Sequence, residues 1–123
     1  MNVVLWIAQS LLAGLFLLAG FTKATQSREG LAARLPWVED FSDGQIRIIG
    51  ILEVLAGLGL ILPAVTGILP VLVPIAAVGL VITMVGAIAV HLRRKEYPGI
   101  AVNVVILLLS AFVAWGRFGP YSF

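Results

Sequence analysis

Four stretches of the chain are apolar for long enough to cross a lipid bilayer as helices. They cover about 3–22, 45–62, 71–91 and 99–116, and a helix needs about 20 predominantly apolar residues to span the hydrocarbon core. Helices suit this solvent because they satisfy their own backbone hydrogen bonds. We therefore predict an all-α membrane protein: a single domain over residues 1–123, folded as an antiparallel bundle of four transmembrane helices.

The composition agrees with a lipid environment. Hydrophobic residues make up 61% of the chain and charged residues only 11%, whereas a soluble domain is about half apolar and about a quarter charged. A chain of 123 residues has too much surface for its volume to hide so many apolar side chains from water. The lipid bilayer is thus the first expected partner. The chain has no basic stripe of the kind that binds nucleic acid, and it has no cysteine, which excludes disulfides and thiol chemistry.

The first connection, about 23–44, is the longest. Within it Leu31, Leu35, Val38 and Phe41 recur at helical spacing, which predicts a short interfacial helix bent at Pro36. Two further signals concern the second span. Ser42 and Gln45 have the spacing of a capping box at its start, and Pro63 is expected to end it. The connection to the third span is short, which predicts a tight antiparallel hairpin.

The orientation follows from the basic residues in the connections, which are enriched on the cytoplasmic side. Connections one and three hold seven of the eight, and the opposite side holds only Arg117. We therefore expect residues 23–44 and 92–98 in the cytoplasm and both termini outside. The seven are Lys23, Arg28, Arg34, Arg47, Arg93, Arg94 and Lys95.

Each span has one face of small and polar residues. Membrane helices associate through such faces because small residues let backbones approach and polar groups form interhelical hydrogen bonds. Turned together, four such faces predict a compact bundle with a polar interior. In chain order the faces are Gln9, Ala13, Gly20 and Lys23; Gly50, Glu53 and Gly57; Gly79, Thr83, Ala87 and His91; and Gly99, Asn103, Ser110 and Ala114.

Glu53 is the acidic residue inside an otherwise apolar second span. A carboxylate in lipid is costly and normally faces a partner or a cavity, so we expect it to point inward, toward Lys23, His91 or Asn103. Two interpretations remain open. Glu53 either fixes the packing of the helices or lines a cavity for a small ligand, such as a quinone head group or a proton. One His and one Glu do not make a metal site, and no catalytic residues are identified.

Several segments resemble one known family. LLAGLFLLAGFTK, GILEVLAGLGLILP and MVGAIAVHLRRKEYPGIAVNVV are similar to the DoxX-like family of small bacterial membrane proteins. The likeness rests on Gly20 to Lys23, on the Gly50 and Glu53 pair, and on the His–Leu–Arg–Arg run from His91. The resemblance implies a four-helix bundle in the bacterial cytoplasmic membrane. Some relatives resemble the membrane subunit of a thiosulfate:quinone oxidoreductase, and others look like membrane partners of redox or detoxifying enzymes.

Three functions are compatible with these features. We favour a non-catalytic membrane subunit or assembly partner in a redox-related system, not an enzyme on its own, which docks a membrane or cytoplasmic protein through residues 23–44 and 92–98. The first alternative is a binding protein or oxidoreductase subunit with a site for a quinone-like molecule, lined by Glu53, His91, Lys23 and Asn103. The second is a small transporter that acts as an oligomer. No cofactor is certain, quinone is the candidate, and a homo-oligomer fits each of the three.

Overall fold

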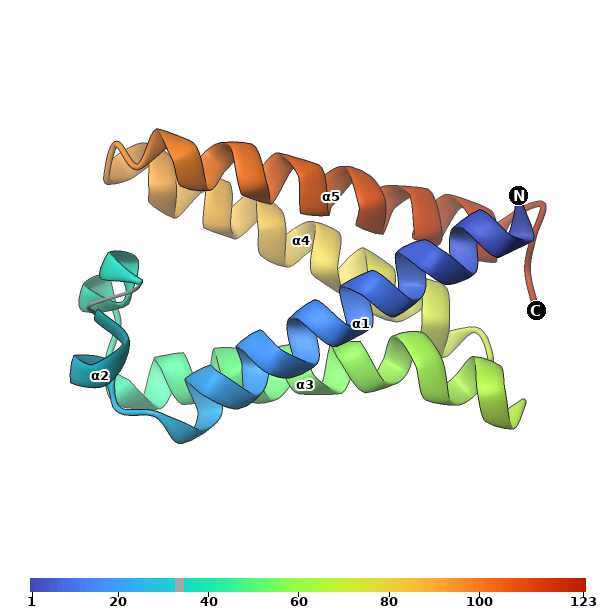
Figure 1. The fold of residues 1–123 in the computed structure, drawn as a ribbon, viewed down its shortest axis with the longest axis horizontal. Helices are drawn as coiled ribbons and strands as arrows, with labels where there is room; N and C mark the ends of the chain where they lie inside the picture. Colours follow the sequence, from blue (N-terminus) through green and yellow to red (C-terminus); the bar gives the residue numbers. More distant parts are fainter. Residues whose placement is uncertain (33–34) are drawn as a thin grey trace.

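The computed structural model describes residues 1–32 and 35–123. Over these residues the chain forms four long helices and two short ones, and both termini lie at the same end of the bundle (Figure 1). In chain order the elements are α1 (Asn2–Thr25), α2 (Arg28–Ala32), the 3₁₀ helix η1 (Pro36–Asp40), α3 (Asp43–Thr66), α4 (Leu72–Arg93) and α5 (Tyr97–Phe118). We call the end formed by residues 23–44 and 92–98 the basic end, and the end with both termini the terminal end.

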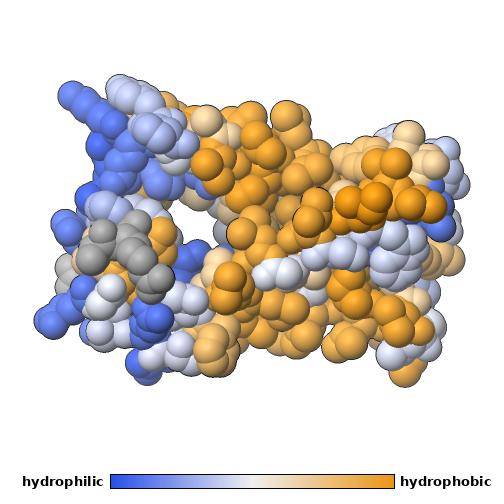
Figure 2. Space-filling view, in the orientation of Figure 1, coloured by the Kyte–Doolittle hydropathy of each residue, from blue (hydrophilic) through white to orange (hydrophobic). Residues whose placement is uncertain are grey.

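The prediction of four membrane-spanning helices is confirmed. Helices α1, α3, α4 and α5 are each long and apolar enough to cross a bilayer. Large apolar side chains cover their outer surfaces, for example Leu18 at 70% and Ile82 at 67% exposed. Figure 2 shows the result as a hydrophobic middle with hydrophilic residues toward both ends. Lipid would remove this apolar surface from water.

The predictions for the two ends of α3 have different outcomes. The capping box is confirmed: the Gln45 backbone N–H donates to Ser42 Oγ at 3.2 Å, and the Ser42 N–H donates to Gln45 Oε1 at 2.9 Å. The prediction that Pro63 ends the helix is wrong, because α3 continues to Thr66. Pro63 removes only one backbone donor, and the helix continues past it. The helix ends at Thr66 because the next residue, Gly67, takes the left-handed conformation (φ 72°).

The long helices pack as two pairs. α1 lies along α3, α4 lies along α5, and α1 crosses toward α5 at the terminal end (Figure 1). Helices α3 and α4 form the predicted hairpin through the short connection 67–71, although each packs more extensively on the partner within its own pair. The apolar core occupies the part of the bundle where the pairs meet. Its most buried members are Leu12, Ala13, Phe16, Leu60, Val73, Ala77, Leu80 and Val113.

The first connection forms a small core of its own. Leu31 in α2, Val38 in η1 and Ile46 in α3 are buried together, and Leu35 and Phe41 pack against them. The expected helical segment is thus divided into α2 and η1, with Pro36 at the start of η1. Of the basic residues counted above, Arg34 lies outside the described residues.

Three of the four predicted faces point into the bundle. Gln9, Gly50 and Ser110 are examples of buried residues on these faces. The face predicted for the third span is wrong over its first half, because Gly79 and Thr83 are exposed. The Thr83 hydroxyl donates to the Gly79 carbonyl at 2.8 Å, so it needs no partner on another helix. The buried residues of α4 are instead Val73, Pro74, Ala77, Leu80 and Met84.

Candidate functional site

Close contact between two glycines positions the polar groups of α1 and α3. A Cβ atom added to Gly20 would lie 2.6 Å from the Gly50 carbonyl oxygen, and one added to Gly50 would lie 2.5 Å from the Ala24 backbone nitrogen. Both distances are too short for a side-chain carbon, so the two backbones touch where each has a glycine. This is the small-residue packing expected between membrane helices. It brings Lys23 and Glu53, each three residues further along its helix, within reach of one another.

Lys23 and Glu53 form an ion pair between α1 and α3. Lys23 Nζ donates to Glu53 Oε1 at 2.7 Å, and the exposed fractions of the two side chains are 12% and 5%. The Lys23 ammonium also lies 5.4 Å from the centre of the Trp37 ring, within the range of a cation–π interaction. The expectation that Glu53 points inward is confirmed. Of the three partners considered for it, the structure brings Lys23 into contact with it.

His91 belongs to a second polar group, on α4 and α5. Its Nδ1 lies 3.1 Å from Glu96 Oε1, and its ring rests against Gly99, where an added Cβ would lie 2.7 Å from Cε1. Glu96 also lies near Arg94, with Oε2 3.3 Å from Nε. The pairing of His91 and Glu96 holds the imidazole at the start of α5. Glu53 and His91 are at the same end of the bundle, but Glu53 contacts Lys23 and His91 contacts Glu96.

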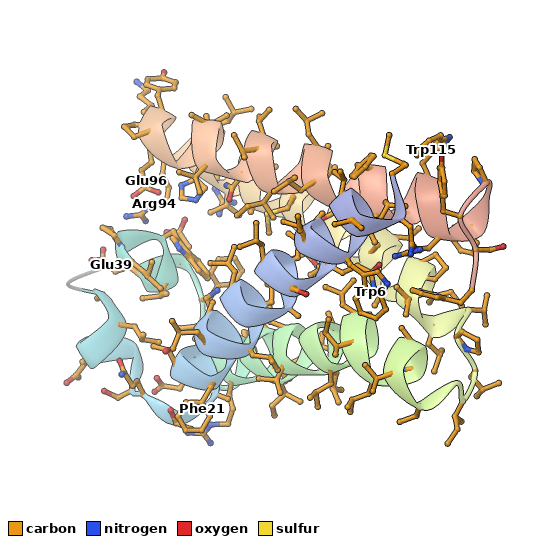
Figure 3. The ribbon with its side chains drawn as sticks, turned by 45° about the vertical axis from the view of Figure 1, so that its right-hand side comes forward. Trp6, Phe21, Glu39, Arg94, Glu96 and Trp115 are labelled. Atoms are coloured by element: carbon orange, nitrogen blue, oxygen red, sulfur yellow. The ribbon has the colours of Figure 1, made fainter. Side chains whose placement is uncertain are left out.

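Asp40 connects η1 to the turn between α4 and α5. Its Oδ1 accepts from Arg94 Nη1 at 2.8 Å, and its Oδ2 accepts from Arg93 Nη2 at 3.1 Å. Figure 3 shows Arg94 and Glu96 together on the side that faces η1. Desolvation alone would lower the pKa of Arg94, but its interactions with Glu96 and Asp40 outweigh it and raise that pKa. Arg94 is therefore charged at any physiological pH, and this contact, which we call the Asp40 clasp, is ionic.

Asn103 lies on α5 with only 8% of its surface exposed. Its Nδ2 is buried and has no hydrogen-bond partner within the described part of the chain. A buried amide donor without a partner is costly and calls for an explanation. The four residues predicted from the sequence thus come from four different helices: Lys23 from α1, Glu53 from α3, His91 from α4 and Asn103 from α5.

The two helix pairs separate toward the basic end. Figure 2 shows an opening through the molecule there, between the α1–α3 pair and the α4–α5 pair, with hydrophilic residues on part of its rim. A separate hollow of about 240 Å³ lies beside Lys23 between α1 and the first connection, lined by Ala19, Thr22, Leu31 and Leu35 as well. Polar groups and space for a small molecule therefore occur at the same end of the bundle.

Arg117 has an environment that was not predicted from the sequence. It was counted only as the single basic group on the outer side, yet it is 3% exposed and donates from Nε to Gln9 Oε1 at 2.6 Å. A signal was present in the sequence. Asn103, Ser110 and Arg117 are spaced by seven residues, which places them on one face of a helix. Among the described residues, no group of three or more His, Asp or Glu side chains is close enough to hold a metal ion.

Comparison with known proteins identifies the family of the chain. The model of the DoxX-like family matches residues 7–113, which is most of the chain and covers α3, α4 and the larger part of α1 and α5. Neither a curated protein nor a solved structure matches. The family match and the four apolar helices together identify an integral membrane protein.

Proposed function

We propose that this chain, which belongs to the DoxX-like family, binds a small amphipathic molecule between its two helix pairs at the basic end. A quinone-like head group is the class of ligand that fits best. The observation that carries this proposal is the unpartnered Nδ2 of Asn103, buried on α5 at the end of the bundle where the pairs separate. A ligand oxygen that accepts from this amide would remove the cost of an unsatisfied donor.

The other groups supply complementary chemistry. A quinone presents two carbonyl oxygens, which accept hydrogen bonds, on a ring that carries an apolar tail. Lys23 is a donor, and its pairing with Glu53 at 2.7 Å keeps the ammonium in position without filling all three of its N–H bonds. In His91 the contact with Glu96 uses Nδ1, so Nε2 is the second ring nitrogen through which the side chain would act. The apolar tail would leave between the helix pairs toward lipid.

The test is ligand-dependent thermal stabilisation in detergent, followed by tryptophan fluorescence. A short-chain benzoquinone should raise the melting temperature of the wild type. Asn103→Leu should melt normally without ligand, since Nδ2 makes no hydrogen bond within the described structure, and should lose most of the shift. Glu53→Gln, which alters the pairing of Lys23, should reduce it.

Thr83→Val is the matched control. Thr83 is exposed on α4 and its hydroxyl bonds only to its own helix in the contacts described above, so the variant should keep the full shift. If Asn103→Leu and Glu53→Gln both retain the shift of the wild type, the ligand does not bind at these residues.

A second candidate function is a non-catalytic subunit that docks a partner protein. The Asp40 clasp supports it, because the contacts of Asp40 with Arg93 and Arg94 join residues 23–44 and 92–98 into one surface, and these are the segments predicted to dock a partner. Affinity purification in mild detergent should then recover a second protein in stoichiometric amount, and Asp40→Asn should reduce its recovery. Recovery of the bare chain in several detergents would contradict this function.

A further inference from the structure

Arg117 lies at the centre of a polar network at the terminal end, far along the bundle from the site proposed above. Its Nε donates to Gln9 Oε1 at 2.6 Å, and its Nη1 donates to Asn2 Oδ1 at 2.6 Å and to the Tyr121 carbonyl at 2.8 Å. Gln9 in turn donates from Nε2 to the Leu60 carbonyl at 2.8 Å. The network therefore joins α1, α3, α5 and the segment that follows α5.

The charge of Arg117 is not neutralised by these contacts. Its hydrogen-bond acceptors among the described residues are all neutral, and the side chain is almost completely buried, with 3% exposed. The rings of Trp6 and Phe123 lie 5.6 and 4.1 Å from the guanidinium carbon, and such contacts offset part of the cost of a desolvated cation. A buried cation normally has a counter-charge as well, since its desolvation costs several kcal/mol.

One donor of Arg117 is also unused. Nη2 is buried and has no hydrogen-bond partner among the residues that the structure describes. Arginine recognises phosphate and carboxylate through two neighbouring N–H groups. A cation with neutral partners and an unpartnered nitrogen has the chemistry of an incomplete anion site.

The location favours phosphate as the anion. Trp6 and Trp115 lie at this end of the bundle (Figure 3), and Tyr121 lies beside Trp115, with ring centroids 6.2 Å apart. Aromatic residues gather at the membrane–water interface, where lipid phosphates lie. A shallow, open groove of about 380 Å³ also lies on the outer surface of α1 and is lined by Val3, Trp6, Ile7, Ser10 and Leu11. Over residues 3–11 it extends about 12 Å along the helix, in the direction that an acyl chain follows.

We propose that Arg117 is the recognition group of a phosphate site at the terminal end, in which Nη2 donates to a phosphate oxygen. The groove along α1 would hold an acyl chain of the same ligand if the phosphate belongs to a lipid. The ring of Phe123 covers the guanidinium and packs edge-on against Trp6 at 5.5 Å, so it must move aside when phosphate binds. Phe123 is itself 47% exposed, which makes this displacement inexpensive.

The experiment measures retention of lipid by the purified protein in native mass spectrometry. Phosphatidylglycerol is titrated against diacylglycerol with the same chains, which lacks the phosphate. The wild type should retain phosphatidylglycerol at about tenfold lower concentration, as expected for a charge-assisted hydrogen bond, and Arg117→Gln should remove this preference. Arg93→Gln is the control: its side chain is 67% exposed at the opposite end, and the preference should persist.

Two further arms complete the test. Phe123→Ala leaves the Arg117 side chain intact and uncovers it, so this variant should retain phosphatidylglycerol more strongly than the wild type, even if Arg117→Gln fails to fold. Adding inorganic phosphate alone and measuring the melting temperature separates the two sources of phosphate. If phosphate raises the melting temperature and this effect requires Arg117, the site binds free phosphate. If the protein retains the lipid but inorganic phosphate does not stabilise it, the site binds phospholipid. Equal retention of both lipids by the wild type without any effect of phosphate, or weaker retention in Phe123→Ala, would overturn the proposal.

Discussion

Replacing Gly50 by alanine should force α1 and α3 apart. The new Cβ would lie 2.5 Å from the Ala24 nitrogen, 2.6 Å from the Gly20 oxygen and 2.9 Å from the Lys23 carbonyl carbon. All three are backbone atoms, so no side-chain rotation relieves the overlap. Overpacking of this kind typically costs about 1–3 kcal/mol, and we expect the upper part of that range. The ratio of folded to unfolded protein should then fall by about 30-fold to 140-fold.

Gly79→Ala is the matched control for this prediction. Gly79 lies inside α4, and apart from its own turn of the helix no atom of the described residues lies within 4 Å of the position that its Cβ would take. The substitution should therefore be neutral or should stabilise the helix by up to about 1 kcal/mol through the higher helix propensity of alanine. Both variants are measured by reversible unfolding in mixed micelles with increasing denaturing detergent, followed by tryptophan fluorescence. Equal stability of the Gly50 and Gly79 variants would refute the argument that backbone contact holds α1 against α3.

Three other predictions concern charged groups and orientation. Lys23→Met alone should destabilise the protein by about 3–5 kcal/mol, because it leaves the Glu53 carboxylate buried without its cation. Adding Glu53→Gln should restore part of this lost stability. A double-mutant cycle in which the two effects simply add would contradict the pairing of Lys23 with Glu53. Asp40→Asn should lower the free energy of unfolding by at most about 1 kcal/mol, as for exposed ion pairs, but should speed amide hydrogen exchange in η1. In the wild type, 1 M salt should speed this exchange as well, because it screens the ion pairs. A cysteine placed at Ser122 is the single thiol of the chain, so an impermeant thiol reagent should label it in intact cells if the termini lie outside, and protection of this thiol would argue for the reverse orientation.

The fold was largely predictable because few alternatives exist in lipid. The spans follow from the length of the apolar runs, and the inward position of Glu53 follows from the cost of a carboxylate in hydrocarbon. The sequence also indicated that Gly20 and Gly50 lie at helix contacts, since each glycine is on the face of small and polar residues of its helix. In each case a single helix carries the signal, so no knowledge of the neighbouring helix is needed.

The errors arose where a neighbouring helix or the local backbone decides the outcome. Gly79 and Thr83 match a small polar face, but the packing of α4 on the other helices turns them outward. His91 was expected near Glu53, yet its Nδ1 lies 3.1 Å from Glu96 Oε1, because Glu96 follows only five residues later in the chain. Arg117 was counted only as the single basic residue on the outer side, because its burial depends on Asn2 and Gln9, at the opposite end of the chain.

The arrangement of the two helix pairs has a mechanical consequence. The pairs are joined through the core and the Arg117 network toward the terminal end, whereas at the basic end they separate and are bridged by the exposed contacts of Asp40. Each long helix is a lever of about 33–36 Å, so a rotation of about 5° at the joined end moves the far end by about 3 Å. A tilt that hardly disturbs the packing at the terminal end would thus widen the gap between the two helix pairs at the basic end by about the diameter of a water molecule.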